Sequence, residues 1–312
     1  MDFADRLIEG LRRVGNPVLV GIDPRMEDLP QGFLDRFPSE RAGIAQAFTA
    51  FGKGVVDAID GLAAIVKFQA AFYEAYGPEG MASLYETAHY ATERGLLVII
   101  DGKRNDIGST AEAYARAYLG KVSCGQRFEQ VWSADALTVN PYLGSDGIIP
   151  FVKVAAREHR GLFVLVRTSN ASAIEFQDLV AEGKPIYRHV ADRLNTWASP
   201  HRGQLGYSLV GAVVGATYPE QLAELRRAMP GVIFLVPGYG TQGGTASDVA
   251  SAFDQNGLGA IINSSRGLTF AYQRPAYAKF ANDWQRAVQE STKDMAADLA
   301  AHTPSGLLHS KV

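Results

Sequence analysis

The stretch Leu96-Leu97-Val98-Ile99-Ile100-Asp101-Gly102-Lys103 joins an unbroken apolar run to a carboxylate and an ammonium group. The run is continuously apolar rather than alternating, which is typical of a parallel strand that is buried on both faces. In α/β folds built on parallel strands, functional groups gather at the carboxyl ends of the strands. This stretch therefore predicts a buried parallel strand that ends in a functional site.

Similar apolar runs recur along the chain, each ended by a polar or glycine-rich cluster. Together with 96–100 we count eight of them, the others being 18–22, 64–66, 136–139, 162–166, 210–214, 232–236 and 259–262. Amphipathic stretches with apolar residues near helical spacing lie between them, at 46–59, 81–94, 110–119, 151–159 and 219–229. Eight such units over about 250 residues predict an α/β fold, a single (β/α)8 TIM barrel, with a doubly wound open sheet as the alternative.

No composition break or Pro/Ser-rich linker divides the chain, so we expect one domain over residues 1–312. The longer connections 24–45 and about 170–208 are expected to be loops or short helices over the mouth of the barrel. We expect the tail from about Asp294, which ends in Thr303-Pro304-Ser305-Gly306, to be frayed.

Composition excludes several classes of protein. With 47% hydrophobic and 10% aromatic residues among 312, the chain has the material for a large core and is not a disordered protein. Lys+Arg number 30 and Asp+Glu 33, a net charge of −3, which disfavours nucleic acid and anionic membrane as partners. The charged start Met1-Asp2-Phe3-Ala4-Asp5-Arg6 does not resemble a signal peptide, and the one cysteine, Cys124, is expected to pack in the interior. We therefore expect a cytoplasmic protein.

Polar side chains follow most of the predicted strands, in positions that a barrel brings to one end. They are Asp23, Lys67, Asp101, Lys103, Arg167, Ser169, Ser264, Ser265 and Arg266, with a glycine-rich segment at 238–244. We expect these residues to converge on one pocket.

The densest polar cluster runs from Asp101 to Thr110. If the strand continues through residue 103, Asp101 and Lys103 point to the same side and form an acid/base pair. Ser109-Thr110-Ala111-Glu112 is interpreted as a capping box that starts the next helix and leaves Asp106 in a loop at the rim of the pocket. A salt-bridged strand end without chemistry is the alternative.

A second cluster, Pro237-Gly238-Tyr239-Gly240-Thr241-Gln242-Gly243-Gly244, is followed one strand later by Asn263-Ser264-Ser265-Arg266-Gly267. Glycines let backbone N–H groups approach an anion, and an arginine binds it in a bidentate manner, at the two loops where barrels commonly bind phosphate. A phosphorylated substrate is predicted. A glycine-rich turn beside a surface arginine is the alternative.

Metal and cofactor sites are not indicated. No histidine directly follows a predicted strand, and no Walker or dinucleotide motif opens a helix after one. We expect no metal and no cofactor.

These residues resemble the orotidine 5′-phosphate decarboxylase family, and most closely its longer bacterial form, the type 2 subfamily. The match rests on Asp101-x-Lys103-x-x-Asp106-Ile107-x-x-Thr110, Val66-Lys67, Gly21-Ile22-Asp23, the 237–244 segment and 263–266, and it covers roughly residues 15 to 285.

The resemblance implies a homodimeric enzyme that converts orotidine 5′-monophosphate to uridine 5′-monophosphate and CO2, the last step of UMP biosynthesis. Lys67, Asp101, Lys103 and Asp106 would form a charged catalytic network at the reacting carbon. Lys103 would protonate C6, Asp101 would face the substrate carboxylate, and Lys67 and Asp23 would hold the ribose. The remaining implied roles are pyrimidine contact by Ser169, phosphate binding by Gln242, Gly243 and Arg266, and entry of Asp106 and Thr110 into the pocket of the partner subunit.

Two other functions remain open at this point. A sister barrel enzyme could use the same Asp101 and Lys103 frame with Mg²⁺ on a sugar phosphate, although Lys67 disfavours a metal there. A phosphometabolite-binding barrel without catalysis is disfavoured by the cost of burying such a charged cluster unless it is used.

Overall fold

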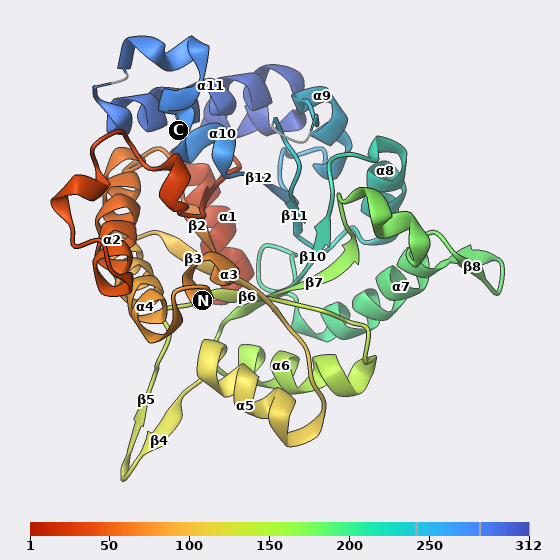
Figure 1. Ribbon diagram of the computed structural model, residues 1–312. Coiled ribbons are helices and arrows are strands. Elements are labelled where there is room, and N and C mark those ends of the chain that lie inside the picture. Colours follow the sequence, from red (N-terminus) through yellow and green to blue (C-terminus); the bar gives the residue numbers. More distant parts are fainter. Residues whose placement is uncertain (241–242, 281, 312) are drawn as a thin grey trace.

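The computed structural model describes residues 1–240, 243–280 and 282–311, and eight parallel strands form a closed barrel at its centre (Figure 1). Each barrel strand pairs with the next one along the chain, and the last pairs with the first. The strands are β1 (Val18–Ile22), β2 (Ile65–Gln69), β3 (Leu97–Arg104), β6 (Ala136–Val139), β7 (Gly161–Arg167), β10 (Val210–Val214), β11 (Phe234–Val236) and β12 (Ala260–Ser264). The closed barrel confirms the predicted (β/α)8 fold and excludes the open sheet.

All eight predicted strands are present, but some of them begin or end at other residues than predicted. The strands β1, β6 and β10 have the predicted bounds, whereas β2 and β3 extend further than their apolar runs. The extension follows from the ladder between them, in which Lys67 pairs with Ile99 and Gln69 pairs with Asp101. Lys67 and Asp101 therefore lie within strands, which fixes their backbones more firmly than a loop would.

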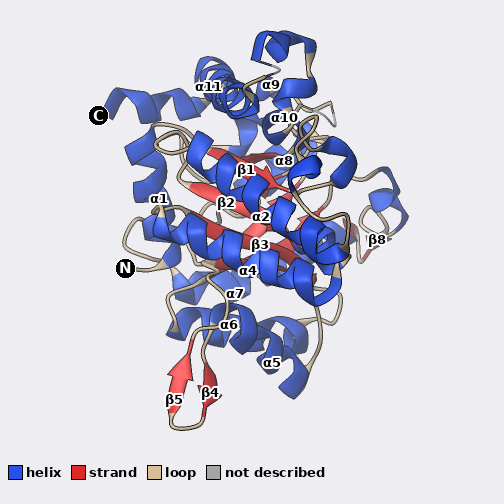
Figure 2. Ribbon diagram, turned by 60° about the vertical axis from the view of Figure 1, so that its left-hand side comes forward, coloured by secondary structure: helices blue, strands red, loops and turns tan. Residues whose placement is uncertain are grey.

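Helices surround the barrel and cover the outer faces of its strands (Figures 1 and 2). They are α2 (Arg41–Ala58), α3 (Ala70–Glu74), α4 (Gly77–Glu93), α5 (Gly108–Leu119), α6 (Ser145–Arg157), α7 (Ile186–Ala198), α8 (Pro219–Ala228), α9 (Ala246–Val249), α10 (Arg266–Thr269) and α11 (Trp284–His302). Along β1, Val18 and Val20 pack in the outer layer while Leu19 packs in the interior cluster. Successive side chains thus alternate between the helix layer and the barrel interior.

The first helix, α1 (Phe3–Val14), closes the amino-terminal end of the barrel. Its Phe3 ring contacts Phe163 edge to face at a centroid distance of 6.0 Å. Gly161 makes room for this ring, since a Cβ atom at this position would lie 2.2 Å from Phe3 Cδ1. This packing fills the amino-terminal end of the barrel.

The first of the two long connections contains the short helices that were expected, and the second also contains a hairpin and a longer helix. Residues 24–45 form two short 3₁₀ helices, Met26–Asp28 and Leu34–Arg36, and then the start of α2. Residues 170–208 hold the 3₁₀ helix Ala171–Glu175, the small hairpin of β8 (Val180–Ala181) and β9 (Lys184–Pro185), and α7.

The expectation of a frayed tail from about Asp294 is wrong. Helix α11 continues without a break to His302, and a 3₁₀ helix, Pro304–Lys311, follows it. Met295 and Leu299, spaced four residues apart on one face of α11, are 4% and 0% exposed. Burial of this apolar face holds the tail on the barrel.

Two further local expectations fail. The capping box predicted at Ser109 is not formed, because helix α5 begins at Gly108 and has no side-chain cap. A reciprocal capping box occurs at the start of α9, between Thr245 and Asp248. Cys124 is exposed on the projecting hairpin of β4 (Val122–Cys124) and β5 (Arg127–Glu129) (Figure 2). Within the described residues, none of the helices combines the length and apolarity needed to span a bilayer.

Candidate active site

A cavity of about 520 Å³ opens at the carboxyl ends of the barrel strands. The predicted polar residues that line it are Asp23, Lys67, Asp101, Lys103, Ser169, Ser264, Ser265 and Arg266. They come from the ends of β1, β2, β3 and β12 and from the segments that follow β7 and β12. The convergence that the sequence predicts for these residues is confirmed.

Lys67 lies between two carboxylates on the floor of this cavity. Its Nζ atom is 3.2 Å from Asp101 Oδ2 and 3.7 Å from Asp23 Oδ1, and its side chain is 5% exposed. Burial alone would lower the pKa of Lys67, but the charges of Asp23 and Asp101 outweigh it and raise the pKa above the ordinary value. Lys67 is therefore a permanent cation within the site.

Asp101 is the centre of the charged network. Its Oδ1 atom accepts hydrogen bonds from Lys103 Nζ and from Thr138 Oγ1, each at 2.7 Å. Burial favours the protonated acid, yet the charges of Lys67 and Lys103 and these hydrogen bonds lower the pKa of Asp101 to about 2. The carboxylate is thus charged throughout the ordinary pH range.

Lys103 reaches Asp101 by a different route from the one predicted. The pairing of β3 with β6 shifts register between Ile100 and Arg104, and Lys103 has φ of 45°. Its backbone N–H donates to Thr138 Oγ1 at 2.9 Å. The two side chains meet because the strand end is irregular, and regular strand alternation does not explain the contact.

Two acceptors in the cavity lack hydrogen-bond donors within the described part of the chain. They are Asp23 Oδ1 and Asn263 Oδ1, both buried. A buried acceptor without a donor is costly, so such atoms favour a ligand that brings hydroxyl or amide N–H groups.

Ser169 follows β7 at the side of the cavity, where Gly215 makes room for it. A Cβ atom on residue 215 would lie 2.8 Å from Ser169 Cα. Arg167, which we expected to join the same pocket, does not line it. Its guanidinium is fully buried, pairs with Asp178 at 3.2 Å and lies 3.9 Å from the ring centroid of Tyr218.

Two residues of the glycine-rich segment, Gly238 and Tyr239, also line this cavity. Gly238, Gly240 and Gly243 have φ of 104°, 74° and 93°, a region that suits glycine. Gly243 lines a neighbouring cavity of about 840 Å³. Arg266, at the start of α10, is exposed and lines the charged cavity. Gln242 lies outside the described residues.

Asp106 and Thr110 do not line the cavity of their own chain. Asp106 Oδ1 accepts from the backbone N–H of Ile107 at 2.8 Å, and Thr110 is exposed on α5. Ile107, which adjoins Asp106 in the sequence, is 52% exposed, and Tyr142 and Leu143 after β6 are 84% and 44% exposed. These two residues therefore lie on a partly apolar outer surface.

Other polar residues of the cavity were missed by the sequence analysis. They are Arg25, Gln69, Thr138, Thr168, Asn170 and Gln177. Thr138 is the clearest case, because it is the only polar residue of β6 and holds both Asp101 and the Lys103 backbone. A polar residue inside an otherwise apolar strand was the available signal.

Comparison with known proteins agrees with this geometry. Residues 18–280 match the model of the Orotidine 5′-phosphate decarboxylase / HUMPS family. A protein of Rhodopirellula baltica named orotidine 5′-phosphate decarboxylase is 49% identical over 298 residues, 95% of this chain and 98% of its own length. A protein of the same name from Caldicellulosiruptor bescii is 42% identical over 90% of this chain and 93% of its own.

A solved structure gives the same result. The OMP decarboxylase of Leishmania donovani superimposes with a TM-score of 0.74 at 30% identity, covering 97% of this chain and 98% of its own. The matched family model, the near full-length relatives and the barrel with its charged network lead to one conclusion. The chain belongs to the orotidine 5′-phosphate decarboxylase family.

Proposed function

We propose that this chain decarboxylates orotidine 5′-monophosphate to uridine 5′-monophosphate and CO2, the last step of UMP biosynthesis, with Lys103 as general acid and without a cofactor. The observation that carries the proposal is the chain of alternating charges from the buried Lys67 to the buried Asp101 to the half-exposed Lys103, in a cavity that Arg266 also lines. The relatives named for this activity match nearly the whole chain.

Substrate binding uses the two sides of the cavity. The 5′-phosphate binds at Gln242, Gly243 and Arg266, since backbone N–H groups and a guanidinium suit a dianion. The ribose hydroxyls donate to the free acceptor of Asp23, and Lys67 donates to a ribose oxygen. Ser169 contacts the edge of the pyrimidine. This orientation places C6 and its carboxylate over Asp101 and Lys103.

The chemical step breaks the bond between C6 and the carboxylate, and its electron pair stays on C6. CO2 leaves, and Lys103 Nζ donates a proton to C6; the resulting amine recovers a proton from solvent. The developing charge at C6 is not delocalised into a cofactor, so a fixed ammonium must stabilise it. Asp101 supports this step because its carboxylate, 2.7 Å from Lys103 Nζ, accepts a hydrogen bond from the ammonium and holds it in place.

The magnesium-dependent sister reaction fits the site less well. It requires a further carboxylate beside Asp101 to ligate the metal. The structure has the Lys67 ammonium 3.2 Å from Asp101 at that position. A cation fixed there repels a divalent metal ion.

We further propose a homodimer in which Asp106 and Thr110 of each subunit enter the pocket of the other. Support comes from their position outside the pocket of their own chain and from the exposed apolar residues Ile107, which adjoins Asp106, and Tyr142 and Leu143 after β6. We also propose that residues 1–312 form a single domain and that the protein is cytoplasmic.

Reaction in D₂O tests the proposed chemistry. With unlabelled orotidine 5′-monophosphate, the enzyme should form uridine 5′-monophosphate that carries deuterium at C6, detected by proton NMR as loss of the H6 signal. Formation of this product by the Lys103→Ala variant at the wild-type rate would show that another group supplies the proton.

A further inference from the structure

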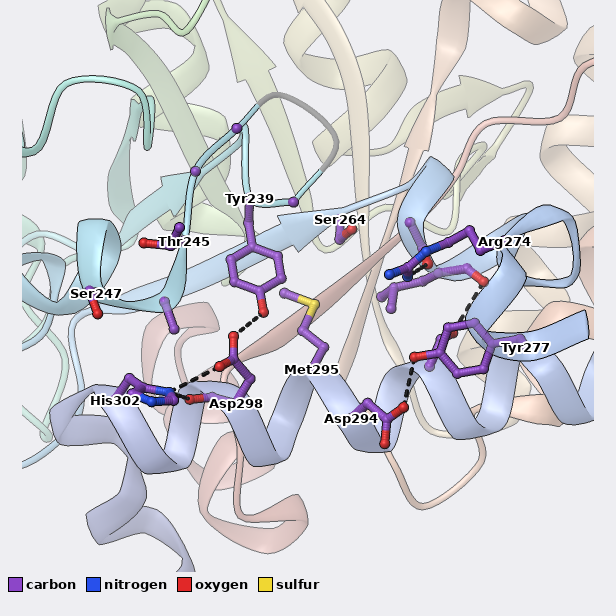
Figure 3. A pocket seen from close by; sticks show the side chains of 17 residues that line it. Tyr239, Thr245, Ser247, Ser264, Arg274, Tyr277, Asp294, Met295, Asp298 and His302 are labelled. Atoms are coloured by element: carbon purple, nitrogen blue, oxygen red, sulfur yellow. Dashed lines mark hydrogen bonds and ion pairs between the residues drawn. The ribbon is translucent and has the colours of Figure 1, made fainter.

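Tyr239 separates two cavities at the carboxyl end of the barrel. It lines the charged cavity and also the neighbouring one of about 840 Å³, which lies between the glycine-rich segment and α11 (Figure 3). In Figure 3 the Tyr239 side chain extends from the segment toward α11 and meets Asp298. A residue of the predicted phosphate-binding loop thus contacts the C-terminal helix.

The contact is a short hydrogen bond within a small network. Tyr239 Oη donates to Asp298 Oδ2 at 2.5 Å, and His302 Nδ1 lies 2.9 Å from Asp298 Oδ1 (Figure 3). Burial, and next the hydrogen bond to Asp298, raises the pKa of the Tyr239 hydroxyl, so it keeps its proton and remains a donor. His302 Nδ1 also lies 2.9 Å from the backbone carbonyl of Asp298, so the tyrosine hydroxyl is the hydrogen-bond donor to the Asp298 carboxylate in this network.

Tyr239 lies at the neck of the glycine-rich segment, where the two arms of the segment come together. It forms a bridge with Gly244, and Gly240 N–H donates to the Gly244 carbonyl at 2.8 Å. Gly244 N–H in turn donates to the Gly238 carbonyl at 3.1 Å. A bond that fixes Tyr239 therefore fixes both arms of the segment.

We propose that Tyr239, held by Asp298 of α11, is a positioning residue that fixes the glycine-rich loop on the C-terminal helix and thereby sets the affinity for the 5′-phosphate of the substrate. The inference rests on the proposed phosphate contacts of Gly243 and Arg266. Helix α11 lies beyond residues 18–280, the part matched by the family model. The C-terminal helix thus gains a role in substrate binding that the matched region does not include.

The chain offers a matched control for this hydrogen bond. Tyr277 Oη donates to Asp294 Oδ2 at 2.7 Å, one turn before Asp298 on the same helix and in the same cavity (Figure 3). Tyr277 belongs to the 3₁₀ helix Pro275–Phe280 and not to the glycine-rich segment. Loss of this hydroxyl removes an equivalent bond to α11 without releasing the loop.

The experiment compares Tyr239→Phe, Asp298→Ala and Tyr277→Phe with the wild type. For each, kcat/KM is measured for orotidine 5′-monophosphate and for orotidine, the nucleoside that lacks the phosphate, together with the inhibition constant of inorganic phosphate. Tyr239→Phe and Asp298→Ala should lower kcat/KM for the nucleotide roughly 5- to 10-fold, the effect of one hydrogen bond. They should weaken inhibition by phosphate to a similar degree and leave kcat/KM for the nucleoside unchanged. Tyr277→Phe should leave all three values unchanged.

The outcomes separate this inference from the proposed function. Equal behaviour of Tyr239→Phe and Tyr277→Phe, or equal losses with nucleotide and nucleoside, would overturn the positioning role. Arg266→Ala serves as the reference, because it should discriminate strongly between the two substrates. If Arg266→Ala lowers kcat/KM more for the nucleotide than for the nucleoside and Tyr239→Phe does not, only the inference fails. If neither variant shows this difference, the proposed phosphate site is also wrong.

Discussion

Lys103 is held in a backbone conformation that a lysine rarely adopts. Its φ of 45° lies in the left-handed region, which costs a residue with a side chain roughly 1–2 kcal/mol. Two hydrogen bonds offset this cost, from its N–H to Thr138 and from its Nζ to Asp101. The strained residue is the proposed proton donor, and the strain directs its ammonium group toward the other charges of the cavity.

Replacing this lysine tests its role. Lys103→Ala should lower kcat by about 10⁴-fold or more, because it removes both the proton donor and the charge that stabilises C6. The Kd of uridine 5′-monophosphate, measured by calorimetry, should change little, since the phosphate contacts remain. Lys121→Ala, an exposed lysine away from the cavity, is the control and should behave as wild type. Near-normal turnover by Lys103→Ala would show that the assignment is wrong.

Asp101 makes stability depend on pH in a defined direction. Its pKa of about 2 is below the unfolded value near 3.9, so its contribution is present above about pH 4 and is lost as the pH falls toward 2. The contribution is about 2 kcal/mol, so Asp101→Asn should lower the free energy of unfolding at pH 6 by about that amount or more. The difference in the free energy of unfolding between wild type and Asp101→Asn, measured by urea unfolding, should be smaller at pH 3 than at pH 6 by roughly 1 kcal/mol. A difference that does not change with pH would mean that Asp101 ionisation is not coupled to folding.

At the scale of elements, the ends of β7 and β10 are coupled through a single glycine. Gly215 follows β10 and lies so close to Ser169 that any side chain must displace it, with a Cβ only 2.8 Å from Ser169 Cα. Gly215→Ala should therefore raise KM for orotidine 5′-monophosphate several-fold, by moving the proposed pyrimidine contact. If the effect acts through Ser169, the double variant with Ser169→Ala should be little worse than Ser169→Ala alone. Fully additive losses would indicate a separate cause.

What the sequence could predict at this scale follows from the kind of interaction involved. Continuous apolar runs mark buried parallel strands, so all eight barrel strands were placed, and the charges at their ends located the cavity. The irregular end of β3 could not be predicted from the residue pattern, because the φ of Lys103 depends on the Thr138 hydroxyl of another strand. Likewise, the order of the C-terminal helix depends on burial of Met295 and Leu299 against distant elements. Such tertiary contacts override local signals. The capping motif at Ser109 is present and unused, and nothing in the structure explains why.

At the scale of the whole molecule, the proposed shared sites give a prediction about mixing. Lys103→Ala and Asp106→Ala should each be nearly inactive alone. In a dimer that contains one subunit of each kind, one pocket combines an intact Lys103 with an intact Asp106. Mixing the two proteins under conditions that exchange subunits should therefore restore about a quarter of wild-type activity. No recovery, with subunit exchange demonstrated by mass spectrometry, would place Asp106 in the pocket of its own chain, and an active Asp106→Ala variant would place it outside any pocket.

The most direct test of the central claim is the absorbance change when orotidine 5′-monophosphate is added to the purified, EDTA-treated protein without any cofactor. The account predicts rapid loss of the orotidylate absorption band and formation of uridine 5′-monophosphate. No change, with protein shown to be folded by circular dichroism, would contradict the account, and activity on a sugar phosphate that appears only with Mg²⁺ would replace it with the sister reaction.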